Sequence, residues 1–157
     1  MSKAFTKEDD DKEEPAPRPL PSVLPPGAKN YLTPDGAQRL RAELDARVQA
    51  GRPDERIQEL IRILDSAVIL GPPSEDLDIV RFGAAVRVRS LPSGETARYR
   101  IVGVDETDVA RGWISWVSPV AKALLSAAVG DRVRAKLPSG EKELEVLDVT
   151  YGMRSRG

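Results

Sequence analysis

Catalysis by this chain would have to use carboxylates, lysines or a borrowed metal, because its 157 residues include no histidine and no cysteine. Those absences exclude thiolate chemistry, disulfides, the usual zinc ligands and any nucleophile that depends on a histidine base. One acidic pair, Asp54 and Glu55, follows Gly51-Arg52-Pro53 between two helical patterns. Such a pair could serve a metal, but acids also stabilise the first turn of a helix. We favour the helical role, and expect no catalytic residue, no metal site and no cofactor.

A second acidic group, Asp105, Glu106 and Asp108, lies in an expected loop. Its spacing does not match a calcium-binding loop, so we interpret these carboxylates as surface charges. Basic residues instead alternate with apolar ones along the neighbouring strand patterns. They predict a basic sheet face that is either solvated or in contact with an acidic partner or RNA: Arg81, Arg87, Arg89, Arg98 and Arg100.

Two amphipathic helices, at 33–50 and 53–70, must position the first acidic pair. Thr33 is a good N-cap and Pro34 suits the first helical position. Apolar residues then recur at helical spacing in both segments: Leu40, Leu44 and Val48, then Ile57, Leu60, Ile61, Leu64 and Val68. The short connection at Gly51-Arg52 predicts an antiparallel hairpin, a short coiled coil, with Arg52, Asp54 and Glu55 at its tip.

The segment from about residue 79 to 151 has the alternation of β-strands. Two identical Leu-Pro-Ser-Gly-Glu sequences, at 91–95 and 137–141, predict hairpin turns. Ser118-Pro119 begins one short helix between them. Trp113 and Trp116 fall in one expected strand, 113–117, so we expect one in the core and the other exposed. The fold class is therefore α+β, an antiparallel sheet with one helix.

Composition separates the ends of the chain from this body. Residues 8–14 are mostly acidic and prolines follow them, which predicts a disordered tail over 1–29. We divide the rest into a hairpin (30–71), a β domain (72–152) and a short tail (153–157). The 24 basic and 25 acidic residues leave no excess of positive charge for sequence-specific nucleic-acid binding. With no membrane span or signal peptide apparent, we expect a cytoplasmic monomer.

Several of these segments resemble the bacterial Gre transcript-cleavage factors, GreB more than GreA. The resemblance rests on Tyr-Leu-Thr-Pro-Asp-Gly at 31–36, Ile-Val-Gly-Val-Asp-Glu at 101–106, Ser-Pro-Val-Ala-Lys-Ala-Leu-Leu at 118–125 and Val-Gly-Asp at 129–131. It implies an FKBP-like C-terminal domain and binding to RNA polymerase at the rim of the secondary channel. The polymerase-binding residues that it implies are Ser118, Pro119, Ala121, Lys122, Leu124, Leu125 and Asp131.

The hairpin departs from that family. In the cleavage factors a long coiled coil ends in an acidic Gly-Asp-x-x-Glu-Asn tip that helps hold a second magnesium ion in the polymerase active site. This chain lacks that tip, and its finger has less than half the expected length. In form it is closer to the Rnk-like regulators. We therefore expect a non-enzymatic regulator that does not stimulate cleavage.

Three alternatives stay open. The chain could be an active cleavage and elongation factor that uses its shortened tip. It could be an FKBP-like isomerase, chaperone or interaction module unrelated to polymerase, although few aromatic residues are available to line a proline pocket. It could also be an adaptor whose hairpin packs on another helical protein, which would require exposed apolar residues outside the hairpin stripe.

Overall fold

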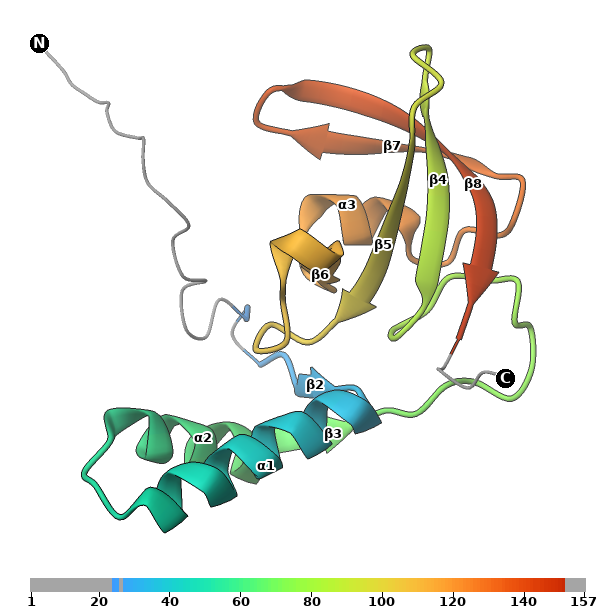
Figure 1. Cartoon of the computed structure of the whole chain (residues 1–157). Coiled ribbons are helices and arrows are strands. Elements are labelled where there is room, and N and C mark those ends of the chain that lie inside the picture. The colour runs from blue at the N-terminus through green and yellow to red at the C-terminus, as the bar shows by residue number, and fades with distance from the viewer. Residues whose placement is uncertain (1–23, 26, 152–157) are drawn as a thin grey trace, which may run out of the picture.

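A helical hairpin projects from one end of a small β domain (Figure 1). The computed structural model describes residues 24–25 and 27–151. The predicted C-terminal tail and almost all of the predicted N-terminal tail lie outside these residues. Within the described part, no helix is long and apolar enough to cross a membrane.

The first helix, α1 (Pro34–Ala50), begins and ends where its sequence predicts. The Thr33 side chain accepts a hydrogen bond from the Gly36 backbone N–H, and Pro34 occupies the first turn, where no intrahelical donor is needed. Gly51 ends the helix with a left-handed conformation (φ 75°) that glycine adopts without steric cost. The 17 residues of α1 give a finger about 25 Å long at about 1.5 Å per residue.

The second helix, α2 (Glu55–Ser66), is shorter than the predicted segment 53–70. Asp54 caps it by accepting the Arg56 N–H, so Pro53 stays outside the helix. At the other end, β3 (Ala67–Ile69) pairs in parallel with β2 (Asn30–Leu32), the strand that leads into α1. The β-branched Val68 and Ile69 favour this extended end over a further helical turn. The two strands therefore close the base of the hairpin.

The hairpin core is concentrated near this base. Leu32, Leu40, Leu60 and Ile63 are buried there together with Ala37. Two residues of the predicted stripe are not buried: Val48, near the tip end of α1, is 55% exposed, and Ile61, between Leu60 and Ile63 on α2, is 45% exposed. Apolar packing therefore anchors the proximal part of the finger, while its distal part needs other contacts.

The β domain is a five-stranded sheet in the order β6-β5-β4-β8-β7. Its strands are β4 (Ala85–Leu91), β5 (Thr96–Val102), β6 (Trp113–Ser115), β7 (Arg132–Leu137) and β8 (Gly140–Thr150). Neighbours pair antiparallel except for β5 and β6, which are parallel. The prediction of a wholly antiparallel sheet is therefore wrong at β6. The chain reverses there through η2 (Val109–Arg111), a 3-10 turn that the strand pattern did not predict.

The single predicted helix, α3 (Pro119–Leu124), covers one face of this curled sheet (Figure 1). Ser118 caps it, and Ala121 and Leu124 are completely buried against the sheet. The core on this face combines residues from α3 with alternate residues of the strands, as the period-two pattern predicts: Val86, Val88, Ile101, Ala135, Leu144 and Val146.

Both Leu-Pro-Ser-Gly-Glu sequences form hairpin turns, as predicted, but in two different conformations. The first connects β4 to β5 through residues 92–95 and contains a cis Leu91-Pro92 peptide bond. The second connects β7 to β8 through residues 138–139 only. Gly94 and Gly140 have positive φ values of 83° and 126°, which explains why glycine stands at both positions.

Candidate functional site

One buried carboxylate joins the hairpin to the β domain. The side chain of Glu106, in the loop after β5, is 1% exposed. It accepts hydrogen bonds from the Thr33 hydroxyl, the Thr33 backbone N–H (3.0 Å) and the Gly103 backbone N–H (2.8 Å). Thr33 thus caps α1 and contacts the β domain with the same side chain. Because a buried charge is stable only when nearby donors satisfy it, this contact fixes the direction in which α1 leaves the domain.

Two glycines leave the room that the Glu106 carboxylate occupies. A Cβ atom added to Gly36 would overlap the carboxylate itself. One added to Gly103 would overlap the backbone carbonyl of Tyr31 and approach Glu106 Oε2. Neither glycine has a positive φ, so space and not backbone conformation is what these positions require.

A second contact, between Asp35 and Arg100, holds the first turn of α1 against β5. The Arg100 guanidinium donates to both carboxylate oxygens at 2.9 and 2.8 Å, and Arg39 donates to the same carboxylate at 2.9 Å. The Arg100 hydrogen bonds, followed by that from Arg39, hold the pKa of Asp35 well below its usual range despite partial burial. Bidentate pairs of this kind define orientation as well as proximity.

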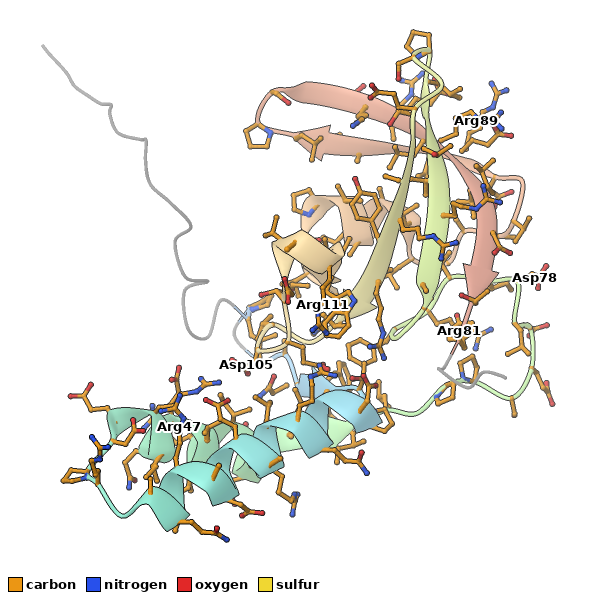
Figure 2. All side chains as sticks on the ribbon, in the orientation of Figure 1. Arg47, Asp78, Arg81, Arg89, Asp105 and Arg111 are labelled. Carbon is orange, nitrogen blue, oxygen red and sulfur yellow. The ribbon has the colours of Figure 1, made fainter. Side chains whose placement is uncertain are left out.

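The indole ring of Trp113 lies among three guanidinium groups in the region where the hairpin meets the β domain. We call this region, around Thr33, Asp35, Arg100 and Glu106, the joint. Arg39, Arg100 and Arg111 approach its centroid to 4.7, 5.2 and 4.9 Å. Each arginine comes from a different element, α1, β5 or η2, and Figure 2 shows Arg111 where the β domain approaches the hairpin. Cation–π attraction to one ring therefore connects all three elements.

The prediction that the loop carboxylates are surface charges is wrong for Glu106. Asp105 is half-buried, and desolvation raises the pKa of its carboxyl although Asn30 donates to it at 3.3 Å. Asp108 remains partly exposed and pairs with Arg111 at 3.5 Å. Sequence reasoning missed the joint because its partners lie 73 residues apart. The sequence did contain one signal of close packing at this place: Gly36 follows Thr33 by three residues, and Gly103 precedes Glu106 by three.

The prediction that Trp113 and Trp116 lie on opposite faces of one strand, 113–117, is also wrong. The strand ends at Ser115, so Trp113 and Trp116 do not share a strand. Both rings are half-buried. Trp116 packs on the domain core and meets Tyr31 edge to face at 5.3 Å between centroids, while Trp113 belongs to the joint.

An ion-pair network replaces the missing apolar packing near the tip. Arg47 contacts Glu43 at 2.9 Å and Asp54 at 2.5 Å. Arg56 contacts the same Glu43 at 3.0 Å and Glu59 at 3.0 Å. Glu43 thus joins an arginine from each helix, and Figure 2 shows Arg47 near the free end of the finger.

These contacts leave few carboxylates free at the tip. Asp54 caps α2, and its hydrogen bonds from Arg47 and from the Arg56 backbone lower its pKa. Glu55 and Arg52 are both exposed. Across residues 24–25 and 27–151, no group of three or more acidic side chains is arranged to hold a metal ion. The carboxylates of Glu43 and Asp54 therefore serve to hold the two helices together at the tip.

Residues 74–151 match the family model described as transcription elongation factor GreA/GreB, C-terminal. Transcription elongation factor GreB of Xanthomonas axonopodis pv. citri is 36% identical over 160 residues, covering 81% of this chain and 95% of the relative. The chain belongs to the GreA/GreB family. GreA of Rhodospirillum rubrum is 34% identical, covering 77% of this chain and 97% of its own. A solved GreA/GreB structure from Nitrosomonas europaea is 27% identical, with a TM-score of 0.45, and covers 78% of this chain and 100% of its own.

The alignment with GreB extends beyond the residues that this chain contributes. Because 81% of 157 residues is about 127, about 30 of the 160 aligned positions have no residue here. The GreB relative therefore contains about 30 residues for which this family member has no counterpart.

The docking residues carried over from the Gre resemblance do not form one exposed surface. Ala121 and Leu124 lie on the buried side of α3, and Ser118 uses its side chain as the helix cap. Asp131 is exposed, and its carboxylate accepts the Ala128 N–H at 2.9 Å. Pro119 and Lys122 are exposed and Leu125 is half-buried. Of the seven residues, Ala121 and Leu124 are the two that could touch a partner only if the core rearranged.

Proposed function

We propose that this chain binds bacterial RNA polymerase at the rim of the secondary channel and does not stimulate transcript cleavage. The β domain is the docking part of this proposal, with Pro119 and Lys122 exposed on α3 and Leu125 half-buried at its end. The finger enters the channel without reaching the catalytic magnesium. The chain is then a non-enzymatic regulator that competes with other channel-binding factors.

The observation that carries this proposal is the state of the fingertip. Asp54 is held as a helix cap by the Arg56 N–H and as an ion pair by Arg47. A second catalytic metal needs free carboxylates placed at the reacting phosphate. Of the two acids at the start of α2, Asp54 is held in this way and only Glu55 forms no ion pair with a described residue. The finger itself is about 25 Å long. A short finger with one uncommitted acid at its tip supports the proposal, as do the roughly 30 residues of GreB that have no counterpart here.

Transcript cleavage on stalled polymerase complexes tests the proposal. We expect no cleavage above that of polymerase alone, and reduced cleavage when the chain is added in excess over a cleavage-active GreB. Paired variants Asp54→Asn and Glu55→Gln should leave both results unchanged. Cleavage that depends on either carboxylate would instead show an active factor with a shortened tip, and failure to bind polymerase would remove the proposal entirely.

A further inference from the structure

A hollow of about 370 Å³ lies between the end of α2 and the loop after β5. Asn30 of β2 lines it, together with Ser66, the last residue of α2, and Asp105 in the loop. Figure 2 shows Asp105 in the region where the β domain approaches the hairpin. Three parts of the chain that are distant in sequence therefore contribute polar groups to one place.

The side chain of Asn30 carries an unsatisfied hydrogen-bond acceptor at this hollow. The residue is only 9% exposed. Its amide nitrogen donates to Ser66 Oγ at 3.4 Å and to Asp105 Oδ2 at 3.3 Å, and both of these residues also line the hollow. Its amide oxygen, Oδ1, is buried and accepts no hydrogen bond from any described residue. Because a buried acceptor without a partner is costly, this oxygen favours the binding of a hydrogen-bond donor.

The lining of the hollow is also acidic. Three of its residues are acids, Glu59, Asp65 and Asp105. Arg62 alone is basic among the described residues that line it, so three negative charges and one positive charge leave −2 when all four groups are ionised. Desolvation raises the pKa of the Asp105 carboxyl, which means that a positive charge nearby would stabilise its ionised form. The hollow therefore favours a donor that is also a cation.

From this arrangement we infer that the hollow binds the guanidinium group of an arginine on a protein partner. In the part of the chain that the structure describes, the acids are not arranged to hold a metal ion. A guanidinium suits them better, because its five N–H donors are spread over a planar fork. Two donors can meet the Asp105 carboxylate while a third meets Asn30 Oδ1. The inference concerns this hollow alone and does not depend on the proposed function.

Apolar side chains in the same hollow suit the stem of an arginine. Leu24, Ile63 and Val104 line it beside the polar groups. The methylene groups of an arginine pack on such apolar surface while its charged head stays among polar atoms. This combination favours arginine over a small inorganic cation, which has no apolar part, and over a phosphate group, which the acids would repel.

Binding of a short arginine peptide to the full chain tests the inference. The probe is acetyl-glycyl-arginyl-glycine amide, and the matched control peptide has citrulline, which keeps the shape and the N–H donors but not the charge. We expect the arginine peptide to produce saturable NMR shifts at the Asn30 side-chain amide and at backbone positions 59–66 and 104–106. The citrulline peptide should bind about tenfold more weakly, because hydrogen bonds between charged groups are stronger. Equal binding of the two peptides, or shifts only at other positions, would overturn the inference.

Two substitutions separate binding from folding. Asp105→Asn removes the charge but keeps an oxygen that can accept from Asn30. We expect this variant to bind the arginine peptide about tenfold more weakly at an unchanged or higher melting temperature, because a desolvated carboxylate has been replaced by a neutral group. Asp148→Asn, which changes an exposed carboxylate on β8, is the control and should bind as the unchanged chain does.

Three outcomes would contradict the inference. Full binding by Asp105→Asn would show that the carboxylate does not receive the guanidinium. A melting temperature that falls together with the affinity would assign Asp105 a structural role. Broadening of the same NMR signals by Mn²⁺, with no response to the arginine peptide, would identify the hollow as a site for an inorganic cation instead.

Discussion

Thr33 and Glu106 form the link on which the shape of the molecule depends. The Thr33 hydroxyl donates to the Glu106 carboxylate while the same oxygen accepts the Gly36 N–H that starts α1. A helix cap and a contact between hairpin and β domain therefore share one atom. Loss of either residue affects both the helix start and the orientation of the finger.

Removing the buried carboxylate should be costly. Glu106→Ala leaves the Thr33 hydroxyl, the Thr33 N–H and the Gly103 N–H without their acceptor. We expect the free energy of unfolding to fall by about 3 kcal/mol, because buried donors without partners keep their full desolvation cost. Urea denaturation measures this loss. The exposed Glu141→Ala is the control and should change stability by less than about 0.5 kcal/mol. Equal effects would show that Glu106 is not a joint.

A glycine substitution tests the close packing at the same place. Alanine usually stabilises a helix relative to glycine, but a Cβ at Gly36 would overlap the Glu106 carboxylate. We therefore expect Gly36→Ala to lower the free energy of unfolding by about 2 kcal/mol. Gly71→Ala, where no atom lies within 4 Å of the added Cβ, is the control and should be nearly neutral. A stabilising Gly36→Ala would contradict the observed packing.

Acid should weaken the contact between Asp35 and Arg100. The folded pKa of Asp35 is depressed, so its contribution is present above the unfolded pKa near 3.9 and is lost as pH falls through the folded value. Asp35→Asn should cost about 1 kcal/mol at pH 7, since the pair is partly exposed and screened. That difference from the unchanged chain should shrink below about pH 4. Denaturation curves across pH measure it, with exposed Asp65→Asn as the control. A pH-independent difference would exclude the ionic role.

The tip network predicts a local effect. Glu43→Gln removes the negative charge that Arg47 and Arg56 share. We expect faster amide hydrogen exchange at 47–58 with little change in global stability, because exposed ion pairs contribute only about 0–1 kcal/mol each. Asp45→Asn, on the same helix, should leave exchange at the tip unchanged. Unaltered protection in Glu43→Gln would show that the tip is held by other contacts.

Two substitutions in α3 separate docking from folding. Lys122 is exposed and Leu124 is fully buried. Lys122→Glu should weaken polymerase binding at unchanged melting temperature, whereas Leu124→Ala should cost about 2–5 kcal/mol of stability through the cavity it leaves. Thermal denaturation beside a polymerase pull-down distinguishes them. Full polymerase binding by a stably folded Lys122→Glu chain would move the docking surface away from α3.

Local rules predicted much of the fold. The Thr33 and Ser118 caps, the stop at Gly51 and both hairpin turns are confirmed, because each depends on residues within a few positions of one another. The end of α2 was misplaced because parallel pairing with β2, a partner 37 residues earlier, outweighs the helical apolar pattern at 67–69. The parallel register of β6 likewise depends on a distant partner, so no local signal indicates it.

The joint shows the same limit more sharply. Glu106 looks like any loop carboxylate in the sequence, and only the fold brings Thr33, Gly36 and Gly103 around it. The basic face was predicted from alternation, but Arg100 is committed to Asp35. Alternation reports which face a side chain occupies and not which partner it meets.

The pairing of β2 with β3 has an evolutionary consequence. Because these strands bring the two ends of the finger together, residues can be added to or removed from its far end while the base keeps the same hydrogen bonds. Reach is therefore a trait that selection can adjust separately from docking. Under the proposed function, deletion at the far end would turn an active factor into a competitor of its own relatives, while the base of the finger stays paired as it is.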